Sequence, residues 1–67
     1  MIYENIRNIR EDKDKTQKEI ADYLNITQTT YSKYELGKIN IPVEVFEKLA
    51  DLYGVTVDYL LGRTNQK

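Results

Sequence analysis

Apolar side chains recur at helical spacing along nearly the whole chain. Ile2, Ile6 and Ile9 repeat every three or four residues, which places them on one face of a helix. Leu49 and Tyr53 repeat in the same way further along. The sequence predicts no strands. The pattern therefore predicts an all-α fold, a compact five-helix domain with helices at about residues 2–12, 17–24, 28–36, 42–53 and 57–61.

The residues between the apolar segments predict where the helices begin and end. Thr16 is a suitable N-cap, and Glu19, three residues later, completes a capping box. Asn25 tolerates the left-handed conformation that ends a helix, and Thr27 is a second N-cap. Two short helices should thus be joined by a tight turn. The remaining boundaries are predicted from Gly37, Pro42, Gly54, Thr56 and Gly62.

The two central helices have different faces. Ala21 lies on the apolar side of the first, where a small side chain lets two helices approach closely. Tyr31 and Tyr34 share the side of the second helix that can pack on a core. The opposite side lacks the dense Glu/Lys pairing of a merely solvated helix. It carries a row of polar side chains, namely Gln28, Thr29, Ser32 and Lys33.

These features occur in a specific order between residues 16 and 38. The order consists of Gln17, Ala21, Leu24-Asn25-Ile26, Thr27-Gln28, Tyr31 and the segment Tyr34-Glu35-Leu36-Gly37-Lys38. In this combination, the chain resembles the helix-turn-helix of the Cro and phage-repressor family, the XRE-type regulators. It departs from that family at Asn25, where Gly is usual, and at Tyr31, where a smaller Ile or Val is usual. The resemblance extends over roughly residues 2–62. It implies a repressor-like domain over residues 1–62, with the motif at about 17–36, followed by a polar tail at 63–67.

Both the residue chemistry and the resemblance predict a DNA-binding surface. Gln amides pair with adenine, Lys pairs with guanine, and a Thr methyl can contact a thymine methyl, so the row at 28, 29, 32 and 33 is predicted to read bases. Gln17, Thr27 and Lys38 are predicted to contact phosphates. For Gln17 and Lys38, taken singly, ordinary surface exposure is an equally good explanation. The resemblance further implies a structural ion pair between Arg10 and Glu35 that fixes the angle of the recognition helix.

Composition excludes several classes of function. The 67 residues make one small domain and include no Cys and no His, so thiolate or imidazole metal sites are excluded. The carboxylates are scattered on exposed faces, so we expect no enzyme activity. No cofactor, metal or small-molecule ligand is expected. The sequence contains neither an apolar run of membrane-spanning length nor a signal segment, which predicts a cytoplasmic protein without membrane contact.

The net charge of −1 is unusual for a DNA-binding domain, and its distribution matters. Residues 41–60 carry four acids against Lys48, a net charge of −3, whereas the rest of the chain carries nine Lys or Arg against seven acids, a net charge of +2. The acidity is thus concentrated away from the helix-turn-helix. We therefore predict a sequence-specific, repressor-like regulator that binds double-stranded DNA. The alternative is a protein-interaction module that keeps the fold without binding DNA.

One recognition helix covers too few base pairs to select a site in a genome, so a dimer is expected on DNA. The last helix offers more apolar side chains than so short an element needs for its own packing. We predict a weak or DNA-assembled homodimer through Val57, Leu60 and Leu61.

Overall fold

Five helices follow one another in the computed structural model, which describes residues 2–67. They are α1 (Glu4–Asp12), α2 (Gln17–Leu24), α3 (Gln28–Leu36), α4 (Val43–Tyr53) and α5 (Val57–Leu60). Within the described range there is no strand, so the predicted all-α fold is confirmed. No helix in this range is long and apolar enough to cross a bilayer.

Three helix boundaries differ from those predicted. α1 begins at Glu4 rather than at residue 2, because Tyr3 leaves the helical conformation and its ring packs edge-on against Phe46, with centroids 5.1 Å apart. Pro42 is the N-cap of α4 rather than its first residue, since its ψ of 147° is extended. α5 ends at Leu60, one residue early, and Gly62 follows with a φ of 79°.

The turn between α2 and α3 has the predicted chemistry. Thr16 and Glu19 form the complete capping box at the start of α2. Asn25 ends that helix in the left-handed conformation, with a φ of 61°, and the Thr27 hydroxyl accepts from the Thr30 amide at 3.1 Å. Because only Asn25, Ile26 and Thr27 separate the two helices, α2 packs directly on α3.

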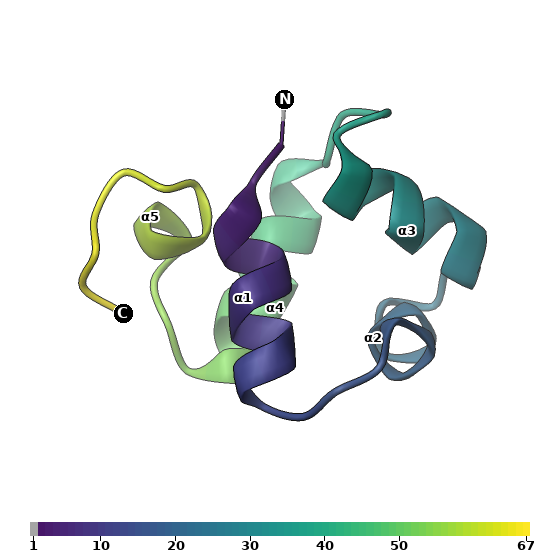
Figure 1. Ribbon diagram of the computed structural model, residues 1–67, viewed down its shortest axis with the longest axis horizontal. Coiled ribbons are helices and arrows are strands. Elements are labelled where there is room, and N and C mark those ends of the chain that lie inside the picture. Colours follow the sequence, from purple (N-terminus) through teal and green to yellow (C-terminus); the bar gives the residue numbers. More distant parts are fainter. Residues whose placement is uncertain (1) are drawn as a thin grey trace.

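The core lies between α1 and the other four helices. Figure 1 shows α1 crossing the centre of the molecule, with α5 on one side, α2 and α3 on the other, and α4 behind it. Every helix contributes buried apolar side chains to this single core. Its members are Ile6, Ile9, Ile20, Ala21, Leu24, Tyr31, Tyr34, Phe46, Leu49, Ala50, Tyr53, Tyr59 and Leu60.

The polar segment at 63–67 turns back toward α1 instead of extending away from the domain. The Arg63 amide donates to the Asp58 carbonyl at 2.9 Å. Lys67 Nζ lies 3.7 Å from Asp12 Oδ2 and 5.8 Å from the centroid of the Tyr59 ring. Both Lys67 contacts are exposed or peripheral, so they contribute little to stability.

Replacing Asn25 tests the conformational requirement of the α2–α3 turn. Asn25→Ala should lower the free energy of unfolding by about 1 kcal/mol, because alanine is strained at a φ of 61°. Asn25→Gly is the matched control and should be neutral or stabilising, since Asn25 is exposed and no packing changes. Urea denaturation measures both variants. Equal stability of the Ala variant and the parent would contradict a strained turn.

Candidate nucleic-acid interface

α3 is anchored by one face and exposed on the other. Tyr31 is completely buried, and its ring meets that of Tyr34 edge-on at 6.4 Å. Glu35, the residue after Tyr34, is also buried. The opposite side forms what we call the recognition face, which consists of Gln28, Thr29, Ser32 and Lys33. Because the buried side is held by packing on several helices, the recognition face has a fixed direction.

The recognition face borders an open hollow of about 410 Å³. All four of its residues line this hollow, together with Gln17 from the start of α2, Lys38 from the loop after α3, and Leu36. The structure thus brings together six of the seven residues that the sequence predicted to contact DNA. The walls of the hollow carry hydrogen-bond donors and acceptors, and two of the lining residues are lysines, Lys33 and Lys38. Such a surface suits an anionic, hydrogen-bonding partner.

Thr27 is the one predicted contact that does not line the hollow. Its hydroxyl caps α3, where it accepts from the Thr30 amide at 3.1 Å and donates to Thr30 Oγ1 at 2.9 Å. The side chain is nonetheless exposed at the first turn of the helix.

An ion pair behind the recognition face ties α3 to α1. Arg10 Nε donates to Glu35 Oε2 at 2.7 Å, and Arg10 Nη2 donates to Glu35 Oε1 at 3.1 Å. The two side chains are only 13% and 4% exposed, so the pair is bidentate and largely removed from water. Arg10 Nη1 also donates to the Lys15 carbonyl at 2.9 Å. The family resemblance implied the pairing of Arg10 with Glu35, but not the bond to the loop.

Gln17 joins this network from α2. Its Nε2 donates to Glu35 Oε1 at 3.0 Å, so one carboxylate connects α1, α2 and α3. The buried Tyr31 hydroxyl also lies close to the carboxylate and lowers its pKa, although it makes no hydrogen bond of good geometry within residues 2–67. The orientation of Gln17 at the rim of the hollow is therefore set by the buried pair.

Burial and hydrogen bonding act in opposite directions on Glu35. Burial raises the pKa of this carboxyl, but hydrogen bonds from Arg10 and Gln17, together with the neighbouring Tyr31 hydroxyl, lower it below its ordinary value. Glu35 is therefore ionised at neutral pH. Burial also raises the pKa of the Tyr53 hydroxyl to about 12 and moves that of Tyr31 further in the same direction, so both remain protonated.

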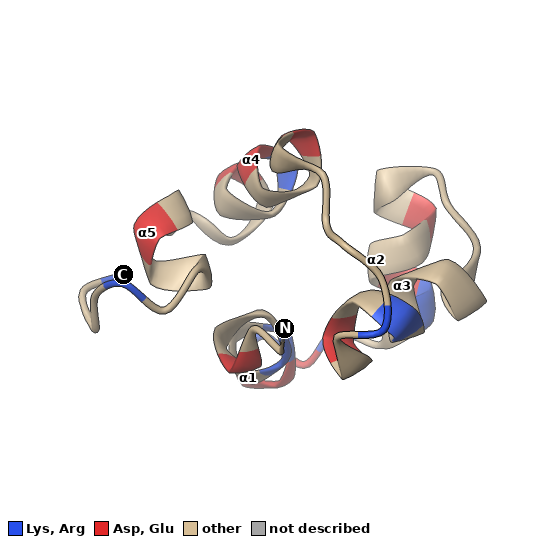
Figure 2. Cartoon of the chain, turned by 90° about the horizontal axis from the view of Figure 1, so that it is seen from above, with Lys and Arg blue, Asp and Glu red and all other residues tan. Residues whose placement is uncertain are grey.

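Charge is distributed unevenly over the surface. Figure 2 shows acidic positions along α4 and α5, with the basic Lys48 among them, and basic positions at α3 and in the loop that follows it, with the acidic Glu35 also on α3. The exposed lysines of the interface are Lys33 and Lys38. The small net negative charge of the chain is thus compatible with a locally basic recognition surface.

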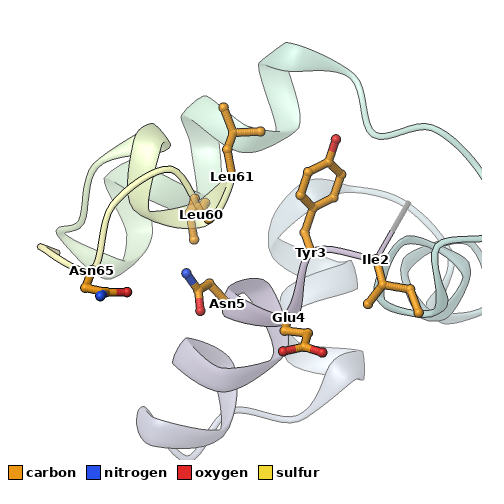
Figure 3. Close-up of a pocket in the computed structure, with 8 residues that line it drawn as sticks. Ile2, Tyr3, Glu4, Asn5, Leu60, Leu61 and Asn65 are labelled. Carbon is orange, nitrogen blue, oxygen red and sulfur yellow. The ribbon is translucent and has the colours of Figure 1, made fainter.

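The three apolar residues predicted for a dimer contact are not equally accessible. Leu60 is completely buried in the core, so the prediction that it lies on a contact surface is wrong. Val57 and Leu61 are partly exposed. Figure 3 shows Leu60 and Leu61 pointing in different directions beside a hollow of about 300 Å³ between the start of α1 and the end of the chain. The four-residue helix must use Leu60 to close the core, whereas Val57 and Leu61, which follows the helix, pack against the core and stay partly exposed.

The fold and the recognition face define a helix-turn-helix protein, and comparison with known proteins agrees. Residues 6–60 match a family model described as Helix-turn-helix, so the chain belongs to this family. This confirms the family predicted from the sequence.

The chain is similar to several curated regulators. It is 37% identical over 65 residues to the SPbeta prophage-derived uncharacterized HTH-type transcriptional regulator YonR of Bacillus subtilis, which covers 97% of this chain and 60% of that protein. It is 37% identical over 67 residues to the HTH-type transcriptional regulator AnsR of B. subtilis, and this match covers 100% of this chain and 58% of that protein. It is 39% identical over 62 residues to the cryptic phage CTXphi transcriptional repressor RstR of Vibrio cholerae, and this match covers 92% of this chain and 55% of that protein. The chain thus spans a little more than half the length of these relatives.

Sequence reasoning missed one residue and one contact of the site. Leu36 lines the hollow and is 55% exposed, although its spacing from Ser32 and Lys33 already puts it on their side of the helix. The bond from Gln17 to Glu35 joins positions 18 residues apart, and no local pattern indicates it.

Removing the Glu35 carboxylate tests how strongly the network holds α3. Glu35→Ala should lower the free energy of unfolding by about 3 kcal/mol, because Arg10 would remain largely buried without its partner. Chemical denaturation gives the value. Glu11→Ala, which breaks an exposed pair on α1, is the control and should cost less than about 1 kcal/mol. A similarly small loss for Glu35→Ala would reduce the buried pair to a surface contact.

The same stabilisation should depend on pH. Because the pKa of Glu35 is lower in the folded protein, its contribution is fully present above the unfolded value of about 4.3 and is lost as pH falls through the folded value. Between neutral and acid pH, the free energy of unfolding of the parent should therefore fall by an amount that the Glu35→Gln variant does not lose. Denaturation curves of both proteins at each pH measure this difference.

Proposed function

We propose that this protein binds double-stranded DNA in a sequence-specific manner, with α3 in the major groove, and acts as a repressor-like regulator of transcription in the cytoplasm. The observation that carries the proposal is the shared hollow, where the recognition face meets Gln17 and Lys38. An α-helix fits the major groove, and the exposed side of α3 offers side chains that can reach base edges. Membership of the helix-turn-helix family and the names of the relatives support the same function.

The recognition face would read sequence through complementary hydrogen bonds and one apolar contact. Gln28, in the first turn of α3, can bind adenine through both amide atoms. Lys33 can donate to guanine, and the Thr29 methyl can meet a thymine methyl. Ser32 is half-buried and short, so it suits a base edge that approaches the helix closely. We propose these four residues as the base-reading set.

Phosphate contacts would set the position of α3 along the duplex. Gln17 uses one of its two amide protons on Glu35, which leaves the second for a phosphate oxygen. For Thr27 to contact a phosphate, its hydroxyl proton would have to turn away from Thr30 Oγ1 and toward a phosphate oxygen. Lys38 is exposed beside the end of α3 and is a suitable cation for a third phosphate. These contacts position the protein and carry no sequence information of their own.

We propose further that two copies bind adjacent half-sites about one helical turn apart, roughly 34–36 Å. Val57 and Leu61 supply the apolar contact between copies, and because this patch is small, the dimer is weak without DNA. DNA would then assemble the dimer.

A second function, protein interaction without DNA binding, is favoured by the acidic surface of α4 and α5. The two functions differ in their response to salt. DNA binding should be measurable at low salt and should weaken linearly on a log–log plot as salt rises. Selection of bound sites from random duplexes then supplies the preferred sequence. Failure to bind any duplex at low salt would favour the second function.

Paired substitutions separate positioning from reading. Lys38→Ala should weaken binding to every duplex alike and reduce the salt slope by about one unit, because one phosphate contact is lost. Gln28→Ala should cost roughly 1–3 kcal/mol on the preferred site only, because a base contact is lost. Fluorescence anisotropy on the selected duplex and on a scrambled duplex measures both effects. If Gln28→Ala leaves site preference unchanged, direct readout by Gln28 is wrong.

Substitution of the apolar patch on α5 tests the dimer. Leu61→Asp should abolish cooperative occupation of two half-sites, since a charge in the contact opposes pairing. Because Leu61 also packs partly against the core, a thermal unfolding curve of the variant checks that the fold persists. Leu52→Asp introduces the same charge at an exposed leucine of α4 and should leave cooperativity unchanged. Footprinting on a two-half-site duplex provides the measurement. Independent half-site binding by the parent would rule out the proposed dimer.

A further inference from the structure

A second, smaller hollow connects α1 with the recognition face. It has a volume of about 190 Å³, and its walls include Ser32 from α3 and Gln17 from α2. Arg7 and Arg10 of α1 line it as well, and so do Leu36 and Glu35, the partner of Arg10. A phosphate group held near Gln17 would therefore lie near two guanidinium groups, of which that of Arg10 is already paired with a carboxylate.

The two arginines differ in how many guanidinium N–H donors remain for an external acceptor. Arg10 directs all three guanidinium nitrogens at protein acceptors, two toward Glu35 and one toward the Lys15 carbonyl. Arg7 is 66% exposed, and its bond within residues 2–67 runs from Nε to Glu11 Oε1 at 2.8 Å. Its two terminal nitrogens thus keep four N–H donors for an external acceptor.

We propose that Arg7 is a DNA-contacting residue that binds a backbone phosphate next to the groove occupied by α3. This inference rests on the proposed function and extends the DNA-binding surface from the helix-turn-helix to α1. A guanidinium fork matches two phosphate oxygens. The present bond to Glu11 is exposed and joins residues one helical turn apart, so it is weak enough to be exchanged for a phosphate.

Glu11 acts against this contact. It lines a neighbouring hollow of about 400 Å³ together with Arg7 and two further carboxylates, the exposed Glu4 and the buried Glu35. The exposed carboxylates of Glu4 and Glu11 repel a phosphate, and Glu11 also competes with it for the guanidinium. Arg7 and Glu11 should therefore affect DNA affinity with opposite signs. Long-range charge alone would give the same signs, so a direct contact is identified by the individual phosphate that Arg7 contacts.

Salt titrations of single variants test the contact. Arg7→Ala should weaken binding equally on the selected and scrambled duplexes and lower the log–log salt slope by about 0.9. Arg7→Lys keeps the charge and should retain the slope. Glu11→Gln should strengthen binding by about two- to fivefold at low salt, the range expected for an exposed pair. Lys48→Ala removes an exposed charge from α4 and should leave affinity and slope nearly unchanged.

Neutral phosphate analogues can identify the contacted phosphate. A methylphosphonate is placed at each position of the selected duplex in turn, which removes one negative charge at a time. At one position, the analogue should weaken DNA binding by the parent by the same factor as the Arg7→Ala substitution does. At that position it should not change DNA binding by the Arg7→Ala variant. The thermal unfolding curve of Arg7→Ala checks that the fold persists.

The outcomes distinguish this inference from the proposed function. If the parent binds duplexes and Arg7→Ala keeps the parental slope, Arg7 makes no phosphate contact and the inference is wrong, while the proposed function stands. A lower slope with no position at which the effects coincide would also overturn it, because Arg7 would act only through long-range charge. Absence of duplex binding by the parent would overturn the proposed function itself.

Discussion

The direction of the recognition helix depends on a carboxylate that is almost fully removed from water. Glu35 accepts two bonds from Arg10 of α1 and one from Gln17 of α2, so three helices meet at a single side chain. A buried charge is tolerated only when its partners are in place, which restricts the helices to the arrangement that supplies them. The fully buried Tyr31 beside it leaves α3 little freedom to rotate.

This arrangement gives Gln17 both a structural role and a place in the proposed DNA-binding surface. Gln17 lies at the rim of the recognition hollow and also bonds to Glu35, so the position of a proposed phosphate contact is tied to the buried pair. Such preorganisation lowers the conformational entropy that a side chain loses on binding. Changes that loosen the pair are thus expected to affect both stability and DNA binding.

The separation of charge explains how a slightly acidic chain can carry a DNA-binding surface. Acidic positions lie along α4 and α5, whereas Lys33 and Lys38 lie at the recognition hollow. At physiological salt, charges more than about 8 Å apart are substantially screened, so the local charge at the hollow matters more than the total. Glu11 competes most directly with the proposed phosphate contact on α1, because its carboxylate bonds to Arg7 in the free protein.

The local sequence by itself determined the helices, their caps and the family. Thr16, Asn25 and Thr27 act through bonds and backbone angles within a few residues, which is why periodicity and cap chemistry predicted the turn correctly. Apart from the pair of Arg10 and Glu35, which the family resemblance implied, only the tertiary structure decided which side chains meet across elements. The burial of Leu60, the bond from Gln17 to Glu35 and the place of Arg7 beside the recognition face depend on how helices distant in sequence pack together. That packing is set by the summed fit of the whole core, and no local pattern encodes it.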